Sequence, residues 1–529
     1  MNINRLGAIV RADFLIRLRR PSTVVVFLLL SAMAYLWVPD PSTGRALIQI
    51  DGRRALYNSS AIGLATAILG TIFVGLFGFY VISNALKRDV LSRCGYVIAS
   101  TTMRGSEYIA GKFAGNVVFL SVFMLGFMLT SMSMVLVRGE APLEPFAFML
   151  PYLLLAPPSI VFVSAVAIFF ECTPILRSKF GDVAYFFLWL ATLGIVATVA
   201  EKGKPAGWAQ YFDVSGFGFL MQQMRGLYNT NAMSIGSSTF DAHKGVIVFR
   251  GLQISAAALI PRIVSTIWPL SFLALARLFF HRFDPARVRA VPNEKARRSW
   301  IGRLNLIAKP FARLFVSIGE KLIASSSRAS LFRSAATDAL TTIAAFPLAS
   351  LAIIGFAIAA LASGEKSLLT GVMPIAFAGC AIAIADIACR EKRAGTSALV
   401  YASPLLRARF VLWKFASSLM LGLAFLAVPL LRAITLRPSA GLPLLAGVAF
   451  TCAAATMLGI VSANPKTFLV AFLSFWYVTT QDKGASPSLD FAGWFGTATP
   501  MVIAAYIGIT IAMLAAAHAF HRNELQRRW

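Results

Sequence analysis

Charged residues are scarce in this chain. They make up 13% of its 529 residues, whereas 58% are hydrophobic, and soluble domains average about 25% charged residues. Acidic residues are the scarcer kind, since 22 Asp and Glu stand against 49 Lys and Arg, which gives a net charge of +27. A membrane-spanning helix needs roughly 20 mostly apolar residues, and the chain holds about twelve such runs. The composition argues against a soluble domain and predicts a polytopic helical membrane protein.

Cysteine and histidine are also few. The chain has five cysteines and four histidines, without the CxxC or Cys/His spacing of a zinc site or a disulfide framework. It contains no HExxH, GxSxG or GxxxxGK[ST] motif and no paired aspartates inside the apolar runs. The usual sequence signatures of an intramembrane hydrolase or an ATP-binding loop are therefore absent. We predict no catalytic, metal-binding or cofactor-binding residue and expect that the chain is not an enzyme.

The excess of positive charge is spread over many short loops. Lys and Arg collect in this way in the cytoplasmic loops of membrane proteins. A nucleic-acid-binding domain would instead concentrate them in a basic patch interleaved with aromatic residues. We therefore predict no nucleic-acid partner, and we use the basic loops to orient the chain.

Twelve apolar runs are interpreted as spans. They lie at about 22–38, 60–83, 113–137, 150–171, 180–200, 256–280, 347–363, 368–389, 410–432, 440–462, 467–480 and 500–519. An even number of spans puts both termini on one side, and the Lys and Arg bias puts that side in the cytoplasm. The first run is interpreted as an uncleaved span rather than a signal peptide, because a long basic segment precedes it. We expect a multi-pass protein of the cell inner (plasma) membrane, surrounded by the lipid bilayer.

The chain is expected to divide into a first six-span half, 1–283, a basic cytoplasmic linker, 284–330, and a second six-span half, 331–529. Residues 2–20 alternate apolar residues and arginines at helical spacing, which predicts an amphipathic helix on anionic headgroups. The segment at about 201–255 carries several aromatic residues and glycines, and is expected to form a small structured cap on the outer side.

The two halves echo each other in order. Asp13 and Pro21 near the start recur as Asp338 and Pro347, and the basic loop after the second span recurs after the eighth. Both halves begin on the same side, so the repeat is parallel, with its axis along the membrane normal. The predicted fold class is an all-α polytopic membrane protein with about 12 transmembrane helices in two parallel six-helix repeats (6+6) and amphipathic elbow helices.

The repeated loop reads RCGYVIASTTMRGSEYIAGK (93–112) in the first half. Gly95 is expected to break the preceding helix, and the hydroxyl residues 100–102 to cap a new short one. Arg104 and Glu107 lie three residues apart on that helix, the spacing of an ion pair. Lys112 then returns the chain to the membrane.

In the second half the loop reads RAGTSALVYASPLLRARFVLWK (393–414). Ser403 and Pro404 supply an N-cap and a first helical position, which is a strong helix start. We expect each loop to form a helical elbow that faces the cytosol just under the bundle.

The segment REKRAGTSALVYASPLLRARFVLWK (390–414), with the amphipathic start and the six-span halves, resembles permease subunits of type-2 ABC exporters. The first loop departs from that pattern, because Cys94 precedes Gly95, Tyr96 replaces the threonine and Thr102 replaces the proline. The resemblance implies that each loop is a coupling helix docked in a groove of a separate ATPase subunit. It also implies that two permease units, separate in most such exporters, are fused in one chain.

Two sets of site residues follow from the resemblance. The first ATPase-coupling loop comprises Arg93, Gly95, Thr102, Arg104, Glu107 and Lys112, and the second comprises Glu391, Arg393, Gly395, Ser403, Pro404, Arg407 and Lys414. The implied partners are cytoplasmic ABC ATPase subunits, in two copies, which would bind ATP and Mg. Export of a small hydrophobic or amphipathic substrate, such as a lipid, a peptide or a drug-like molecule, is expected because the interior offers few fixed charges.

An ion-coupled secondary transporter with 6+6 spans is the alternative, and a membrane scaffold or sensor a further one. A proton-coupled carrier needs acidic residues inside the bundle. The candidates, Glu171, Asp182 and Asp386, lie near the expected cytoplasmic ends of spans, where contact with headgroups or with an elbow is expected. Arg262 lies near the outer end of the sixth span and is expected to snorkel outward.

Overall fold

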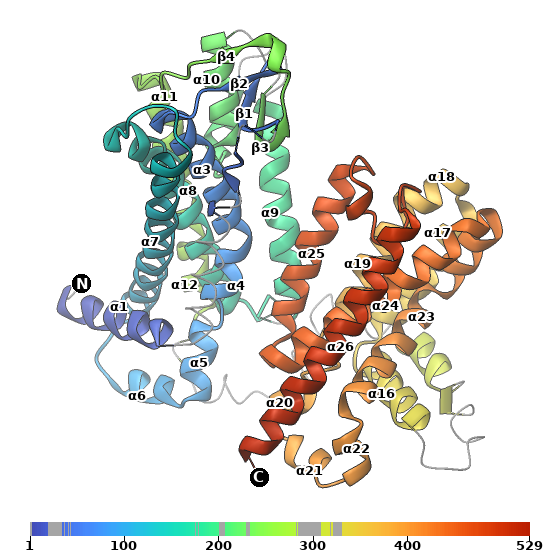
Figure 1. The fold of residues 1–529 in the computed structure, drawn as a ribbon. Coiled ribbons are helices and arrows are strands. Elements are labelled where there is room, and N and C mark those ends of the chain that lie inside the picture. The colour runs from blue at the N-terminus through green and yellow to red at the C-terminus, as the bar shows by residue number, and fades with distance from the viewer. Residues whose placement is uncertain are drawn as a thin grey trace. The chain divides into compact units, whose positions relative to one another are not determined.

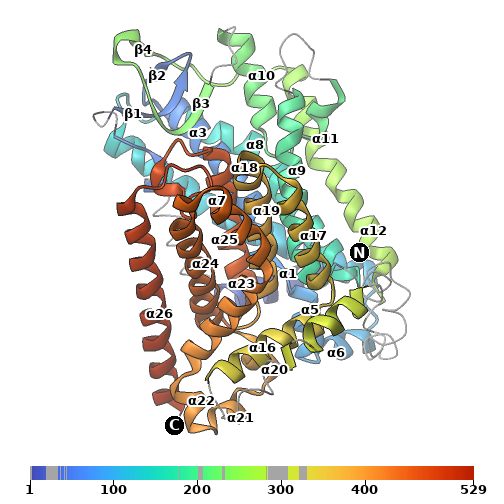
Figure 2. The ribbon, with the colours of Figure 1, turned by 90° about the vertical axis from the view of Figure 1, so that its right-hand side faces the viewer.

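The chain separates into two compact units, Met1–Ala290 and Val291–Trp529. The computed structural model describes residues 3–19, 34–35, 37–40, 42, 44–174, 176–177, 179–199, 207–228, 233–281, 283, 308–317, 319–320 and 331–528. Figures 1 and 2 show the ribbon from two sides. Most of the predicted first span, 22–38, and most of the predicted linker, 284–330, lie outside the described residues.

Eight helical segments in the described part of the chain are long and apolar enough to cross a membrane. They are Ser59–Val90, Gly105–Arg138, Pro145–Cys172, Ala256–Phe279, Glu365–Ile384, Phe410–Leu436, Pro438–Ser462 and Pro500–Gln526. Each coincides with one of the predicted spans. The prediction of a helical, polytopic membrane protein is confirmed at this level.

Three other predicted spans are helical without meeting the same criterion alone. The apolar part of α9 (Lys179–Val199) is the short stretch Phe180–Ile195, and α25 (Pro465–Asp482) has 18 residues but is not apolar enough. The helix α17 (Leu348–Ala362) follows α16 (Leu331–Ala345) after a bend of 96°. The described residues thus account for eight spans, or up to nine if this bent pair is one span, against the twelve predicted.

The first unit is a bundle of long helices that carries a short helix, α1, at one end and a small sheet at the other (Figure 1). Its helices are α1 (Ile3–Leu18), α3 (Ser59–Phe73), α4 (Phe79–Ile82), α5 (Ala85–Leu91), α6 (Cys94–Ser100), α7 (Gly105–Arg138), α8 (Pro145–Cys172), α9, α10 (Phe217–Tyr228), α11 (Ala256–Ile267) and α12 (Ser271–Phe279). A π-helical turn, Val74–Gly78, joins α3 to α4. The helix α3 begins where the side chain of Asn58 accepts a hydrogen bond from the backbone N–H of Ala61, as an N-cap does.

The expectation of an all-α protein is incomplete, because the first unit contains a four-stranded sheet. Its strands are β1 (Arg45–Ile50), β2 (Arg53–Ala55), β3 (Met233–Thr239) and β4 (Val246–Ile247), in the order β3-β1-β2-β4. Asp51 and Gly52 connect β1 to β2 with φ angles of 52° and 80°, the left-handed pair that a two-residue hairpin requires. The cap expected at 201–255 is therefore built together with residues that precede α3.

Glu140, in the turn after α7, attaches this sheet to the bundle. Both terminal nitrogens of Arg54 in β2 donate to its carboxylate at 2.7 Å, and the backbone N–H of Tyr57 donates to it at 3.0 Å. The hydrogen bond from Arg54 lowers the pKa of Glu140 below its ordinary value. The carboxylate thus fixes the strand to the end of a long helix.

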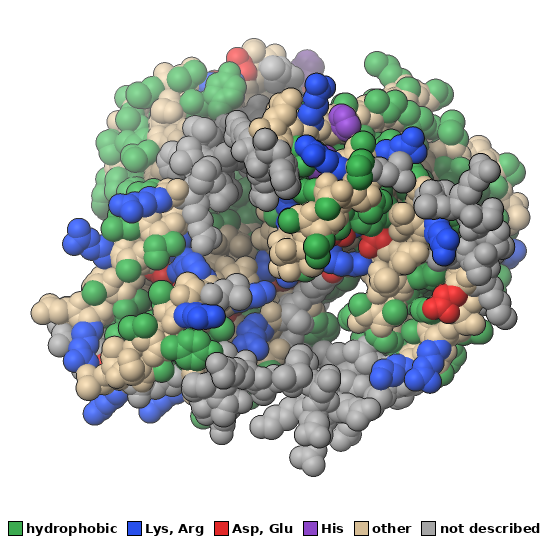
Figure 3. All heavy atoms as spheres, turned by 90° about the horizontal axis from the view of Figure 1, so that it is seen from below, with side chains coloured by type: hydrophobic (Ala, Val, Ile, Leu, Met, Phe, Trp, Pro, Cys, Tyr) green, Lys and Arg blue, Asp and Glu red, His purple; other side chains and the backbone are tan. Residues whose placement is uncertain are grey.

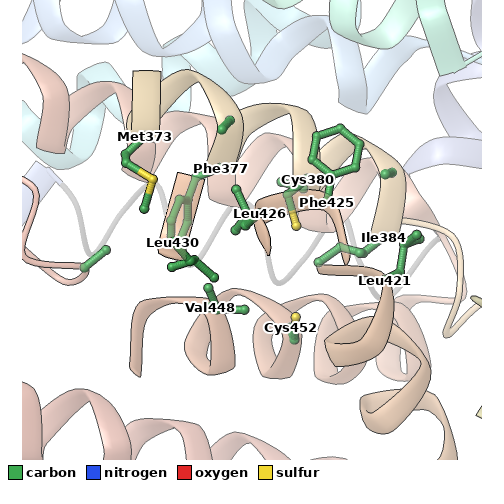
Figure 4. Packing of buried hydrophobic residues seen from close by; sticks show 14 of the residues in the cluster. Met373, Phe377, Cys380, Ile384, Leu421, Phe425, Leu426, Leu430, Val448 and Cys452 are labelled. Carbon is green, nitrogen blue, oxygen red and sulfur yellow. The ribbon is translucent and has the colours of Figure 1, made fainter. Parts of the chain in front are cut away.

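The second unit consists of helices over its described residues. They are α16, α17, α18 (Glu365–Ser367), α19 (Met373–Ile384), α20 (Arg390–Ala394), α21 (Ser397–Tyr401), α22 (Pro404–Ala408), α23 (Phe410–Leu436), α24 (Gly441–Ser462), α25 and α26 (Pro500–Arg528). Side chains of α19, α23 and α24 meet in its apolar core (Figure 4). A Cβ on Gly422 of α23 would lie 3.2 Å from the sulfur of Cys452 and 3.4 Å from that of Cys380, so the glycine allows the neighbouring helices to pack closely.

Candidate functional site

A buried ion cluster attaches α1 to the bundle of the first unit. Asp13 of α1 is 2% exposed and accepts hydrogen bonds from Lys112 of α7 at 2.8 Å, from Arg17 at 3.3 Å and from Arg88 of α5. Lys112 also pairs with Asp89 of α5 at 2.7 Å. We call these five residues the first ion cluster. It lies where α5 and the beginning of α7 meet α1.

The helix α1 can approach α7 closely because α7 carries glycines on the facing side. A Cβ on Gly111 would lie 2.8 Å from the side chain of Ile9, and one on Gly115 would lie 3.5 Å from the Cβ of Asp13. Residues four apart lie on one face of a helix, and small residues at that spacing let two helices come together. This close approach brings Asp13 within reach of Lys112.

The carboxylate of Asp13 is held in its charged form. Burial alone would raise its pKa, but the positive charges of Lys112, Arg17 and Arg88 outweigh that effect, and the pKa lies below the ordinary 3.8. Arg17 in addition donates to the side-chain oxygen of Asn116 at 2.6 Å. The cluster therefore combines paired charges with charge-assisted hydrogen bonds, the arrangement that makes a buried charge tolerable.

The second unit contains a cluster of the same residue types. Asp338 of α16 accepts hydrogen bonds from Lys414 of α23 at 2.8 Å and from Arg390 of α20 at 3.0 Å. Lys414 is fully buried and also pairs with Glu391 of α20. Arg390 lies 3.7 Å from Asp386. We call these five residues the second ion cluster.

The two clusters share one order along the chain. An Asp on a helix before the first long span is followed by an Arg–acid dipeptide, 88–89 or 390–391, and then by a Lys on the next long helix. They differ in their fifth member, because the first cluster contains Arg17 and the second contains Asp386. The first thus has three bases and two acids, and the second two bases and three acids.

In each unit the dipeptide lies in a short helix, α5 or α20, and short helices lead from there to the next long helix, α7 or α23 (Figure 1). We call residues 85–104 the first elbow and residues 390–409 the second. The break in the first elbow lies at Arg93, with a φ of 60°, rather than at Gly95 as predicted. Gly95 is instead buried against Phe283, since a Cβ there would lie 2.8 Å from the aromatic ring. In the second elbow Gly395 ends α20 with a φ of 72°.

The other residues predicted for the first loop separate into two groups. Thr102 and Arg104 are exposed. The short helix expected after the hydroxyl residues is instead the beginning of α7, which starts at Gly105 and continues through Lys112. The carboxylate of Glu107 accepts a hydrogen bond from the backbone N–H of Arg104 at 3.1 Å, so it caps α7. Lys112 belongs to the first ion cluster and is buried.

The residues predicted for the second loop separate in the same way. Arg393 and Pro404 are exposed, and Pro404 begins α22 directly after Ser403, as expected. Arg407 lies in α22, and its carbonyl oxygen is 3.3 Å from a ring nitrogen of His521. Glu391 and Lys414 are buried in the second ion cluster. The structure therefore places some of the predicted residues on the elbow surface and others in the buried ion clusters.

One acid near the end of a predicted span also contacts an elbow. Both carboxylate oxygens of Glu171 in α8 accept hydrogen bonds from the backbone at the start of α5, from Ala85 at 3.0 Å and from Leu86 at 2.6 Å. A carboxylate at this position satisfies N–H groups that have no partner within the helix. The expectation of an elbow contact for this residue is confirmed.

The expectation that Arg262 snorkels outward is wrong. The residue is 3% exposed, and its guanidinium donates to the carbonyl oxygens of Asp213 at 2.6 Å and of Leu154 in α8 at 3.2 Å. The N–H that would ordinarily bond to Leu154 belongs to residue 158, which is a proline and has none. Arg262 thus satisfies a carbonyl oxygen that a proline leaves free, which is a structural role.

Sequence reasoning did not assign Arg88, Asp89 or Arg390 to the site, although it noted the recurrence of Asp13 as Asp338. The signal was an Arg–acid dipeptide that begins 24 residues before the cluster lysine in both loops. Lys and Arg side chains are numerous on the face of the molecule shown in Figure 3, and Asp and Glu are few. The acids of the elbow dipeptides, Asp89 and Glu391, are turned into the clusters.

No group of His, Cys, Asp and Glu that could hold a metal ion occurs in the described residues. Comparisons with family models, with curated proteins and with solved structures found no match for this chain. Function is therefore inferred from the two elbows and from the resemblance of residues 390–414 to permeases of type-2 ABC exporters.

Proposed function

We propose that this chain is the membrane permease of an ATP-driven ABC exporter, with two six-span halves fused in one chain. Each compact unit would correspond to one half, related to the other by a parallel repeat. Both termini and both elbows would face the cytoplasm, beneath a cell inner (plasma) membrane. The elbows would be the coupling helices on which two separate ATPase subunits dock.

The observation that carries the proposal is the matched construction of the two elbows. Each is joined to a preceding helix and to the next long helix by a buried Asp–Arg–acid–Lys cluster. Fixing a short surface segment to two helices at once is useful if a force on that segment must move the bundle. Two such joints, one in each unit, fit a pair of motor subunits.

The energy source would lie outside this chain. The sequence has no phosphate-cradling GxxxxGK[ST] loop, so ATP and Mg would be bound by the partner subunits. Closure of the ATPase pair would displace the elbows and shift the bundle between arrangements of different substrate affinity. The substrate class that we propose is a small hydrophobic or amphipathic molecule.

The acids near the bundle ends favour this proposal over an ion-coupled carrier. A proton relay needs an acid that can exchange its proton with a pathway. In the described residues, Asp13, Asp89, Asp338 and Glu391 are each paired with a base, and Glu171 accepts two backbone hydrogen bonds. Their surroundings favour fixed charges with a structural role.

The test is reconstitution with an ABC-type ATPase that co-purifies with the chain. We expect substrate-stimulated ATP hydrolysis to be lost in Arg104→Glu and in Arg393→Glu, because both arginines are exposed on elbows. Lys366→Glu, at an exposed lysine of α18 outside the elbows, is the matched control and should keep it. Transport that persists without any ATPase and stops when the proton gradient is collapsed would support the carrier instead.

A further inference from the structure

Among the side chains that the structure describes in each elbow, one large apolar side chain is mostly exposed. Val97 in α6 is 67% exposed and Leu399 in α21 is 76% exposed. Each lies fifteen residues before the buried lysine of its ion cluster, Lys112 or Lys414. The same kind of side chain is thus presented at the same point of both elbows.

Exposed arginines precede and follow both side chains along the chain. Arg93 and Arg104 are exposed on the first elbow, and Arg393 and Arg409 are exposed on the second. The acids of the two elbow dipeptides, Asp89 and Glu391, are buried in the ion clusters, so their negative charges do not lie on these surfaces. Each elbow therefore offers an apolar projection flanked by cations.

We propose that Val97 and Leu399 are equivalent anchors that insert into an apolar pocket with an acidic rim, one on each of two copies of the same partner protein. This inference rests on the proposed function, in which that partner is the ATPase subunit. The apolar side chain supplies the buried centre of the contact and the arginines supply its charged rim, the division of roles found in stable protein interfaces. Charge complementarity then selects a partner surface rich in Asp and Glu.

A protein partner fits these surfaces better than the lipid bilayer does. The elbows are short helices whose backbone direction is fixed by left-handed residues, Arg93 and Gly395, and by the buried clusters behind them. A fluid headgroup layer imposes no fixed geometry, so it gives no reason for the same projection at the same place twice. Two copies of one folded pocket explain why the same projection occurs on both elbows.

The first experiment measures affinity between the full chain in nanodiscs and the ABC-type ATPase that co-purifies with it, expressed separately. We expect Val97→Asp and Leu399→Asp each to weaken binding about 10- to 100-fold, because a carboxylate would replace a buried side chain and meet an acidic rim. Leu399→Val, which keeps the apolar character, should bind nearly as wild type. Val248→Asp is the matched control, since Val248 is 53% exposed and lies outside the elbows.

The second experiment uses thiol labelling of the same complex. Cys94 in the first elbow is exposed while the other four cysteines are buried, so it reports on this surface in the natural sequence. Thr396→Cys in a Cys94→Ser background places a thiol at the corresponding position of the second elbow. ATPase binding should slow maleimide labelling at both positions at least tenfold and leave Lys366→Cys unchanged.

The outcomes separate the two proposals. If the ATPase binds and protects both thiols but Val97→Asp and Leu399→Asp bind as tightly as Val248→Asp, the anchor assignment is overturned and the proposed function stands. Protection of the thiols by anionic nanodiscs without ATPase would overturn it in favour of a lipid contact. Failure of the wild-type chain to bind any ABC-type ATPase overturns both.

Discussion

The two ion clusters place the same residue types on corresponding helices, but the first has an excess of bases and the second an excess of acids. In the first, Asp13 receives three bases, two of them arginines on α1 and α5. In the second, Lys414 is fully buried between two acids, and Arg390 is shared by Asp338 and Asp386. The central residue is therefore an acid in the first unit and a base in the second. Losing a central residue leaves several buried charges unpaired, which is the costly case.

The largest expected effect is that of Lys414→Met. The substitution removes the base between Asp338 and Glu391 and leaves only Arg390, which is partly exposed, beside Asp338. Breaking a buried ion pair in this way costs about 3–5 kcal/mol of stability. Thermal unfolding of the detergent-solubilised chain, followed by loss of the monodisperse peak, measures it.

Lys112→Met is the matched variant in the first unit and should cost less, about 1–3 kcal/mol. Asp13 would keep Arg17 and Arg88, and Asp89 would keep the hydroxyl of Tyr108, which donates to it at 2.6 Å. Equal losses for the two lysine variants would show that the balance of charges does not decide the stability of the clusters.

The acids are expected to rank in the opposite order. Asp13→Asn leaves Arg17, Arg88 and Lys112 with Asp89 alone, so we expect a loss of about 3 kcal/mol or more. Asp338→Asn leaves Lys414 with Glu391 and Arg390 with Asp386, so about 1–2 kcal/mol is expected. The same unfolding measurement on both variants tests this reversed ranking of the two units. A larger loss for Asp338→Asn than for Asp13→Asn contradicts it.

A smaller effect is expected from Arg17→Thr, which removes the base that only the first cluster has. Asp13 keeps two cations, while the hydrogen bond from Arg17 to Asn116 at 2.6 Å is lost. We expect a loss of about 1.5–2 kcal/mol, the lower end of the range for one hydrogen bond that involves a charged group. Asn116→Ser is the control that removes the same bond from the other side, and a cost for Arg17→Thr that equals that of Asp13→Asn would make Arg17 the central residue instead.

The sequence predicted the helical membrane class, eight of the spans and the recurrence of the loop, because long apolar runs and repeated motifs are local signals. It did not predict the ion clusters. Asp13 meets Arg88 and Lys112 across 75 and 99 residues of chain, and such a contact depends on how helices pack rather than on spacing within one of them. Helical spacing also suggested Arg104 and Glu107 as a pair on a separate helix, where the structure has the cap of α7.

Two other differences have a local explanation that the sequence contained. Asp51-Gly52 is a common hairpin signal, but a search for long apolar runs passes over strands of six and three residues. The proline at 158 has no N–H, so the carbonyl oxygen of residue 154 lacks its usual helical donor. Predicting that Arg262 supplies the donor would require knowing that α11 packs on α8. No sequence pattern in either helix indicates that packing.

The smallest expected effect is a pH dependence that distinguishes Asp13 from an acid in an unpaired, buried site. Its pKa is lowered in the folded chain, so the stability that it contributes is fully present above its ordinary pKa of 3.8 and is lost only as the pH falls through the lower, folded value. The difference in unfolding temperature between wild type and Asp13→Asn should therefore stay constant from pH 8 to about 5 and narrow only below about 4. Burial acting without the three bases would raise the pKa of Asp13 instead. The difference in unfolding temperature between wild type and Asp13→Asn would then begin to change above pH 5. A difference that stays constant down to pH 5 therefore excludes a pKa raised by burial, as expected where Lys112, Arg17 and Arg88 surround the carboxylate.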